Sequence, residues 1–387
     1  MENWRSATAE RVCSGSSWPE HSNARAESLR KMTTSSPTLL VTADDRTGLL
    51  EAGGACADLG FRVRFGATPI AGDDCALLDI ASRHRLPREA AARAVAAHRH
   101  PARFRCHKMD SGLRGNWAHE IAALLETNRR IGVLPSFPDA GRRCVNGTVL
   151  IHDVPVAETA FGRDPRNRVT SSRPVDYLRA AGCGAALRRG DLRVLDAGDN
   201  AELAAAAARC LDEGRMPVGS TGGIAAYAAV LRTPEPVAPP VLPRPALILC
   251  GSLHPVSRGQ IAALPGPVHG PEDGETIVEE LRGGADVVVA TPLVTGAIHP
   301  AQADAMAARL AAGAWKWLDA GRAKALIILG GDTAAAVLGD RPLDVVGSVD
   351  TGVPLCLAGA DRRAVLTKGG GIGREDTLLK LLFSKMG

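Results

Sequence analysis

Acidic and basic side chains gather at two points in the first half of the chain, each where an apolar run gives way to a helical pattern. Asp44 and Asp45 stand side by side at the first point, and Arg46 follows them directly. Adjacent carboxylates can accept hydrogen bonds from the hydroxyls of a sugar-like ligand, or act as a base toward one of them. The alternative is that one carboxylate caps the following helix while the other faces solvent.

The second point, Lys108 to Asn116, places Lys, Asp, Ser, Arg and Asn within nine residues. The planar guanidinium of Arg114 can grip a carboxylate through two parallel hydrogen bonds, and amides at a helix start favour an anion. Further along, Arg142 or Arg143 can add a contact to a carboxylate or phosphate. This pattern favours a site for a small polyhydroxylated acid over a polar surface turn. The later acids Glu158 and Asp164 are interpreted as holding a loop together.

Three polar or glycine-rich loops in the second half each follow a strand-like apolar run, at residues 251–260, 330–334 and 368–373. Backbone amides at a glycine turn that enters a helix form a ready anion site, although glycine there can also be purely steric. Ligands of open α/β sheets bind beyond the carboxyl ends of the strands. The three loops together therefore predict a phosphate or nucleotide site, with Lys368 as a positive charge at its rim. Neither a Walker A loop nor a Rossmann GxGxxG pattern is present.

Apolar runs alternate with Ala-rich helical stretches from residue 38 onward, which predicts βαβ units and an α/β fold with mainly parallel sheets. The predicted strands are Thr38–Thr42, Arg62–Gly66, Cys75–Ile80, Phe104–Met109, Ile131–Pro135, Arg193–Asp196, Ala246–Cys250, Asp286–Thr291, Ala325–Leu329 and Ala364–Lys368. The predicted helices are Gly48–Gly60, Pro87–His98, Asn116–Arg129, Ala201–Glu213, Gly222–Leu231, Val256–Ala263, Pro300–Ala320 and Glu375–Phe383. Asn146-Gly147, between apolar flanks, predicts a hairpin turn.

Two segments divide the chain into domains. Residues 1–36 lack a sustained period and predict a disordered leader or a mis-assigned start. Residues 233–245 hold six prolines in 13 positions, which excludes a helix or a central strand and predicts a linker. The predicted domains are therefore 37–232 and 246–387, with the active site in the cleft between them.

Composition excludes several classes of protein. The 387 residues carry a net charge of only +4 and 3% aromatic residues, which argues against a nucleic-acid partner. Apolar runs are of strand length, too short for a membrane span. The nine cysteines stand singly without a CxxC spacing, so a zinc site has no support and a reducing cytoplasm is expected. The sequence leaves open whether the chain forms a homo-oligomer.

Seven separated motifs, taken together and in order, resemble those of the four-carbon acid sugar kinase family. The similarity runs from about residue 38 to residue 382. The motifs are TADDRTG (42–48), KMDSGLRGN (108–116), PSFPDAGRRCVNG (135–147), ETAFGRDP (158–165), GSLHPVSRGQ (251–260), GGDT (330–333) and TKGGGIG (367–373). Three positions differ from the family pattern, which often has Ser at 254, Thr at 112 and Ser at 369, where this chain has His254, Gly112 and Gly369.

The resemblance implies two α/β domains and ATP-dependent phosphorylation of the terminal hydroxyl of a four-carbon sugar acid such as threonate, erythronate or an oxo-tetronate. ATP and Mg²⁺ are the expected cofactors, with Asp332 as a candidate Mg²⁺ ligand. The expected catalytic residues are Asp45, favoured as the base, and Asp110. The expected substrate-binding residues are Asp44, Arg46, Lys108, Ser111, Arg114, Asn116 and Arg142. The expected nucleotide-binding residues are Ser252, Gly330, Gly331, Asp332, Thr333, Lys368, Gly369, Gly370, Gly371 and Gly373.

Two other functions stay open on the sequence. An NAD(P)-dependent oxidoreductase would use a similar sheet, but the missing GxGxxG pattern counts against it. A protein of the same fold that binds a sugar acid or nucleotide without catalysis would keep the loops and lose the chemistry.

Overall fold

The computed structural model describes residues 37–66, 74–127, 130–164, 166–232, 237, 240–294 and 299–383. The predicted leader, residues 1–36, lies outside the described residues, as does much of the predicted linker.

The first half alternates strands and helices. Its strands are β1 (Leu39–Ala43), β2 (Val63–Phe65), β3 (Cys75–Asp79), β4 (Phe104–Lys108), β5 (Arg130–Leu134), β6 (Arg142–Val145), β7 (Thr148–Ile151), β8 (Val154–Pro155), β9 (Leu192–Val194) and β10 (Arg215–Gly219). Its α-helices are α3 (Arg46–Asp58), α4 (Pro87–Ala97), α5 (Trp117–Glu126), α6 (Pro174–Ala180), α7 (Gly184–Arg189), α8 (Asn200–Asp212) and α9 (Thr221–Leu231). Short 3₁₀ turns occupy Pro138–Ala140, Val156–Glu158 and Ala160–Arg163.

The second half ends in an antiparallel region. Its strands are β11 (Ala246–Cys250), β12 (Val268–His269), β13 (Val287–Ala290), β14 (Ala325–Leu329), β15 (Leu343–Asp350), β16 (Val353–Ala358) and β17 (Arg363–Lys368). Its helices are α10 (Pro255–Ala262), α11 (Gly274–Arg282), α12 (Pro300–Ala320), α13 (Gly331–Leu338) and α14 (Thr377–Phe383).

Local signals in the sequence set several of these boundaries. Asp45 caps α3 by accepting a hydrogen bond from the Gly48 amide, and Ser220 caps α9 through the Gly223 amide. Pro87 begins α4, where a missing amide hydrogen costs nothing. The Asn146-Gly147 hairpin is confirmed, since β6 and β7 pair around it and both residues have positive φ.

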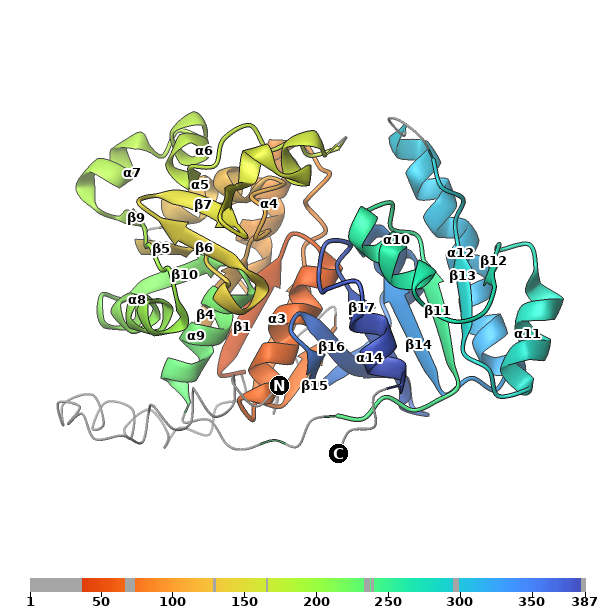
Figure 1. Ribbon diagram of the computed structural model, residues 1–387. Coiled ribbons are helices and arrows are strands. Elements are labelled where there is room, and N and C mark those ends of the chain that lie inside the picture. Colours follow the sequence, from red (N-terminus) through yellow and green to blue (C-terminus); the bar gives the residue numbers. More distant parts are fainter. Residues whose placement is uncertain are drawn as a thin grey trace.

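A single mixed sheet runs through both halves, so the α/β class is confirmed but the two predicted sheets are fused (Figure 1). The strand order is β12-β13-β11-β14-β17-β16-β15-β2-β3-β1-β4-β10-β5-β9. Within this sheet the pairs of the first half are parallel, and the junction is the antiparallel pairing of Leu343–Val345 with Val63–Phe65. Strands β6, β7 and β8 form a separate antiparallel sheet. Strands β15 and β16 were not predicted from the sequence, and neither was β10.

Alternate residues of the strands fill cores on opposite faces of this sheet. Leu39 and Val41 contribute to a core with α3, α8 and α9 that continues under α11, α12 and α13 of the second half. Leu40 lies in the opposite core, with α5 and α6, and α10 and α14 cover the corresponding face of the second half. Because one core passes through both halves, the loops at the carboxyl ends of β1, β4, β11, β14 and β17 hold fixed relative positions.

Candidate active site

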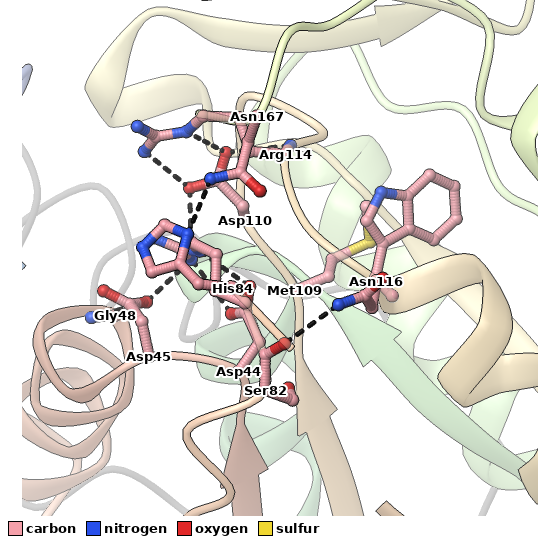
Figure 2. Close-up of polar contacts among 12 residues, drawn as sticks. Asp44, Asp45, Gly48, Ser82, His84, Met109, Asp110, Arg114, Asn116 and Asn167 are labelled. Atoms are coloured by element: carbon pink, nitrogen blue, oxygen red, sulfur yellow. Dashed lines mark hydrogen bonds and ion pairs between the residues drawn. The ribbon is translucent and has the colours of Figure 1, made fainter. Parts of the chain in front are cut away.

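Three carboxylates converge on one arginine at the carboxyl ends of β1 and β4. Arg83 Nε and Nη2 donate to the two oxygens of Asp44 at 2.8 and 2.9 Å, and Nη2 also donates to Asp45 Oδ1 at 2.8 Å. The same nitrogen lies 3.3 Å from Asp110 Oδ1. Figure 2 shows the Asp44, Asp45 and Asp110 side chains directed toward one another. Strands β1 and β4 are neighbours in parallel register, which brings the first two charged motifs together as the sequence predicts.

Arg83 is the functional residue that sequence reasoning missed. It lies in the loop after β3, and its side chain is 11% exposed. The loop carries no recognisable motif. The available signal was the position of β3 next to β1, because loops at the carboxyl ends of neighbouring parallel strands meet at one edge of the sheet.

Asp110 and Arg114 are hydrogen-bonded to each other through both carboxylate oxygens. Arg114 Nε and Nη2 donate to the two carboxylate oxygens of Asp110 at 3.0 and 2.9 Å, and the amides of Gly112 and Arg114 donate to Oδ2. Burial alone would raise the pKa of Asp110, but Arg114 and Arg83 hold it well below its usual range. Arg114 also donates to Asp164 at 3.2 Å. The fork predicted to grip a substrate carboxylate is therefore occupied by two carboxylates of the protein.

Asp44 and Asp45 are adjacent but differ in surroundings. Burial raises the pKa of Asp44 to about 6, although Arg83 lowers it in part. Burial acts on Asp45 in the same direction, but Arg83, Lys108 and a 2.6 Å hydrogen bond from Thr47 together lower its pKa. The Asp44 side chain is fully buried, whereas that of Asp45 is 14% exposed. Asp45 is thus an ionised carboxylate that a ligand can reach.

Two residues predicted to bind substrate serve the scaffold instead. Arg46 pairs with Asp79 at 2.8 Å, donates to the carbonyl of Gly339 and stacks on Phe65. Asn116 donates two 2.9 Å hydrogen bonds to the carbonyls of the 82–85 loop. That contact holds the loop carrying Arg83, so Asn116 supports the site without facing it.

The remaining predicted contacts, Lys108, Ser111 and Arg142, are buried beside the carboxylates. Lys108 Nζ donates to the carbonyl of Met109 at 2.9 Å. Arg142 donates to the Ser111 hydroxyl. The Arg142 guanidinium and that of Arg114 both lie over the Phe161 ring, at 5.9 and 4.8 Å from its centroid. Phe161, which lies between the two acids interpreted as holding a loop together, Glu158 and Asp164, therefore forms a wall of the site.

The three loops of the second half converge as the sequence predicts. A side-chain carbon added at Gly330 would lie 3.2 Å from Ser252, and one added at Gly370 would lie 2.6 Å from the Ser252 hydroxyl. A carbon at Gly251 would lie 2.1 Å from the Thr333 hydroxyl. Gly330 has a φ of 113° just before α13, a conformation that glycine adopts at little cost. These loops pack backbone to backbone around the start of α13.

Lys368 does not lie at the rim of this site, contrary to the sequence-based expectation. It is fully buried and donates to the carbonyls of Gly369 and Ile372 at 2.9 Å and to the Ser257 hydroxyl at 3.3 Å. Burial lowers its pKa to about 8. Lys368 stabilises the 369–373 loop by donating hydrogen bonds to two of its carbonyls.

The carboxylates and the glycine loops face each other across the two halves. A side-chain carbon at Gly331 would lie 3.2 Å from Asp45 Oδ2 and 3.3 Å from the Thr47 hydroxyl. The His254 ring lies 6.5 Å from the Phe161 ring, and burial together with Arg114, Lys368 and Arg142 lowers the pKa of His254 to about 4. This region therefore brings acceptor groups from the first half against the start of α13 in the second.

Asp332 joins the two halves by ion pairs. Its carboxylate lies 3.4 Å from His84 Nε2 and 3.2 Å from Arg166 Nη1, and Arg166 also contacts Asp304 at 3.3 Å. The described residues include no group of three or more His, Cys, Asp or Glu side chains placed to hold a metal. Asp332 therefore offers a single carboxylate, which contacts Arg166 and His84. No helix in the described part of the chain is long and apolar enough to cross a bilayer.

Solved structures share the fold. A protein of Salmonella typhimurium LT2 matches with a TM-score of 0.69 at 19% identity, over 89% of this chain and 98% of that chain. Haemophilus influenzae protein HI1011 matches with a TM-score of 0.63 at 20% identity, over 88% of this chain and 98% of that chain.

Sequence relatives and family models carry more information. Models of a sugar-binding N-terminal domain and a nucleotide-binding C-terminal domain match residues 39–224 and 272–378. A D-threonate kinase of Cupriavidus necator is 32% identical, over 88% of this chain and 96% of that protein. A D-threonate kinase of Bordetella bronchiseptica is 30% identical, over 89% of this chain and 96% of that protein. A D-erythronate kinase of Heliobacterium modesticaldum is 29% identical, over 37% of this chain and 36% of that protein. The chain belongs to the four-carbon acid sugar kinase family.

Proposed function

We propose that this protein transfers the terminal phosphoryl group of ATP to the terminal hydroxyl of a four-carbon sugar acid of the threonate or erythronate type. The relatives named D-threonate kinase and D-erythronate kinase support this substrate class. The match to a nucleotide-binding domain over residues 272–378, which include the loops at 330–334 and 368–373, supports the phosphoryl donor.

The observation that carries the proposal is the position of Gly331 next to Asp45, since a side-chain carbon added at Gly331 would lie 3.2 Å from Asp45 Oδ2. Asp45 is the partly exposed carboxylate of the first half, and Gly331 is the first residue of α13 in the second half. Helix N-termini bind phosphate through their free amides. A hydroxyl that donates to Asp45 would therefore meet a phosphoryl group held at the start of α13.

Phosphoryl transfer depends on alignment and charge neutralisation more than on covalent chemistry. Asp45, with its lowered pKa, is ionised near neutral pH, so it can orient the attacking hydroxyl and accept its proton as the bond to phosphorus forms. Arg83 holds Asp44 and Asp45 in place. Asp110, saturated by Arg114, positions Arg83 and does not act as a base.

ATP would lie along the 251–257, 330–333 and 369–373 loops. Mg²⁺ bound to its phosphates would neutralise charge in the transition state, and Asp332 is the carboxylate placed to contact it. Binding would require Asp332 to exchange its contacts with Arg166 and His84. Those contacts join the halves, so nucleotide binding would change how the halves are held together at this point.

The proposal is tested by coupled ADP release with purified protein, ATP–Mg²⁺ and a panel of sugar acids. We expect turnover with D-threonate, D-erythronate or an oxo-tetronate, and no turnover when the terminal hydroxyl is absent. Turnover with five- or six-carbon acids and none with four-carbon acids would refute the substrate class. ATP binding without turnover on any acid would favour a non-catalytic protein of this fold.

A further inference from the structure

Two buried cations beside Asp45 lack an ion pair among the described residues. Arg142 is 6% exposed, donates to the neutral Ser111 hydroxyl, and has a buried Nε without a hydrogen-bond partner. Lys108 is 2% exposed and donates to the backbone carbonyl of Met109. Buried charges in proteins are normally paired, because removing an ion from water is expensive. The neighbourhood therefore favours an added anion.

Two polar groups in the same neighbourhood also lack partners. Glu51, on α3, is 9% exposed, and its Oε1 has no hydrogen bond. Burial raises the pKa of Glu51, while the nearby Lys108 and Arg142 lower it in part. The Thr221 hydroxyl faces Glu51 closely enough to lower its pKa by hydrogen bonding, although neither Thr221 Oγ1 nor Glu51 Oε1 has a partner within full hydrogen-bonding distance and angle. Neither residue lies in one of the seven sequence motifs.

Thr221 is the first residue of α9, which begins beside Lys108. The preceding strand β10 pairs with β4 so that Gly219 stands opposite Lys108. A side-chain carbon at Gly222 would lie 2.8 Å from the Phe137 backbone, so glycine lets the helix start rest directly on the segment after β5. The amides of the first turn of α9 thus add partial positive charge next to Lys108 and Arg142.

The second half closes over Glu51. A side-chain carbon at Gly352, in the turn between β15 and β16, would lie 2.8 Å from Glu51 Oε1 and 2.9 Å from Ile372. Ile372 belongs to the 369–373 loop. The neighbourhood is consequently bounded by the sugar-binding half on one side and by the nucleotide-binding half on the other, as a substrate site between them requires.

We propose that Arg142, Lys108 and the amino end of α9 at Thr221 bind the carboxylate of the sugar acid, and that Glu51 accepts a hydrogen bond from the hydroxyl next to that carboxylate. This inference rests on the proposed function. It assigns the carboxylate to Arg142 and not to Arg114, whose fork is occupied by Asp110 and Asp164. Anchored there, the acid directs its far end, the terminal hydroxyl, toward Asp45.

The first test compares Arg142→Met with Arg143→Met. Arg143 is the neighbour on β6 but is 40% exposed and pairs with the exposed Asp153. We expect Arg142→Met to raise the KM for D-threonate by roughly 30-fold or more, with the KM for ATP unchanged and the melting temperature unchanged or higher. Arg143→Met should stay within about twofold of wild type, the size of a surface ion-pair effect. A lower melting temperature with an unchanged KM for D-threonate would mean that Arg142 is structural.

The second test addresses the hydroxyl and does not depend on folding of an arginine variant. Wild type should prefer D-threonate to 3,4-dihydroxybutyrate, which lacks the hydroxyl next to the carboxylate, by roughly tenfold in KM, the size of one hydrogen bond. Glu51→Gln should weaken this preference and Thr221→Val should raise the KM of both acids. An undiminished preference in Glu51→Gln would refute the role of Glu51.

The experiments distinguish an error in the proposed carboxylate site, called the anchor below, from an error in the kinase assignment. Wild-type turnover of a tetronate with an unaltered KM in Arg142→Met would refute the anchor and leave the kinase assignment intact. If wild type turns over no tetronate, calorimetric titration with D-threonate in the absence of ATP tests whether the carboxylate site exists. Binding that is lost in Arg142→Met supports the anchor, and a lack of binding to wild type refutes it.

Discussion

At the scale of single residues, Asp45 and Asp110 carry the same functional group in different surroundings. Asp110 is held by Arg114, Arg83 and two backbone amides, so its charge is fully used within the protein. Asp45 retains exposure toward Gly331. The two carboxylates should therefore respond differently to the same substitution.

We expect Asp45→Asn to lower kcat by about 100-fold or more, the effect of losing a general base. It should destabilise the protein by only about 1 kcal/mol, because Asn also caps helices well and Arg83 keeps its two hydrogen bonds to Asp44. Asp110→Asn should instead destabilise the protein by about 3 kcal/mol, because it removes the buried carboxylate that pairs with both Arg114 and Arg83 and leaves Arg114 only its longer contact with Asp164. Initial rates and urea unfolding of both variants measure these effects. A stable Asp110→Asn enzyme with lower kcat would reverse the assignment.

His254 makes stability depend on pH. Its pKa in the folded protein is about 4, below the ordinary 6.5, because of burial and the cations Arg114, Lys368 and Arg142. As pH falls below 6.5 the unfolded chain binds a proton before the folded one does, so stability is lost between pH 6.5 and about 4. His254→Ser keeps a capping side chain on α10 and removes the titrating ring.

The His254→Ser variant should therefore lose about 1 to 2 kcal/mol less stability than wild type between pH 6.5 and 4, a figure reduced for the partial exposure of the ring. Urea unfolding at several pH values measures the difference. Parallel stability curves for the two proteins would show that His254 does not titrate as described.

The sequence predicts which residues come together where two motifs follow strands that become neighbours. Asp44, Asp45, Asp110 and Arg114 lie close to one another because β1 and β4 pair directly. Whether a charged side chain is already paired depends on distant residues. Arg46 forms an ion pair with Asp79, so its scaffold role could not be inferred from its own motif.

At the scale of elements, the start of α13 depends on one backbone conformation. Gly330 has a φ of 113° and a ψ of 137°, a region that is essentially restricted to glycine and costs other residues about 1 to 3 kcal/mol. An added carbon there would also press on Ser252 in the neighbouring loop. The geometry of two nucleotide loops thus depends on this position.

Gly330→Ala should weaken ATP binding by about tenfold or more and lower the melting temperature. Gly214→Ala is the matched control, since Gly214 also has positive φ but lies in a distant turn with open space around its α-carbon. The control should lose about 1 kcal/mol of stability and bind ATP normally. Equal ATP affinity in both variants, measured by calorimetry, would contradict the assignment of this loop.

The strands that the sequence misses lack either an alternation in burial or residues that favour strands. Strand β10, which contains Pro217, is fully buried and so lacks the alternation of a half-exposed strand. Strand β15 does alternate in burial, but its residues Asp344, Gly347 and Asp350 are poor strand formers. Its pairing with β2 and β16 overrides that preference.

At the scale of the whole molecule, the fused sheet limits how the two halves can move relative to each other. The proline-rich linker suggests a hinge between independent domains, yet β2 pairs with β15 and α3 packs on β15, β16 and β17. The core beneath α3 is shared by both halves. Movement between the halves must therefore bend the sheet near β2 and β15 or shift the loops, because free rotation about residues 233–245 would break this core.

The shared core predicts that both halves unfold in one transition. Trp117 is fully buried in the first half, while Trp315 and Trp317 lie on α12 in the second. Fluorescence of a Trp117→Phe variant and of a Trp315→Phe, Trp317→Phe double variant weights the two halves differently. We expect both signals to change at the same urea concentration as the circular dichroism, and a nucleotide to shift all of them together, because neither half can keep its part of the sheet once β2 and β15 separate. Two separated transitions, with only that of the second half shifted by nucleotide, would show that the halves fold independently and restore the linker as a hinge.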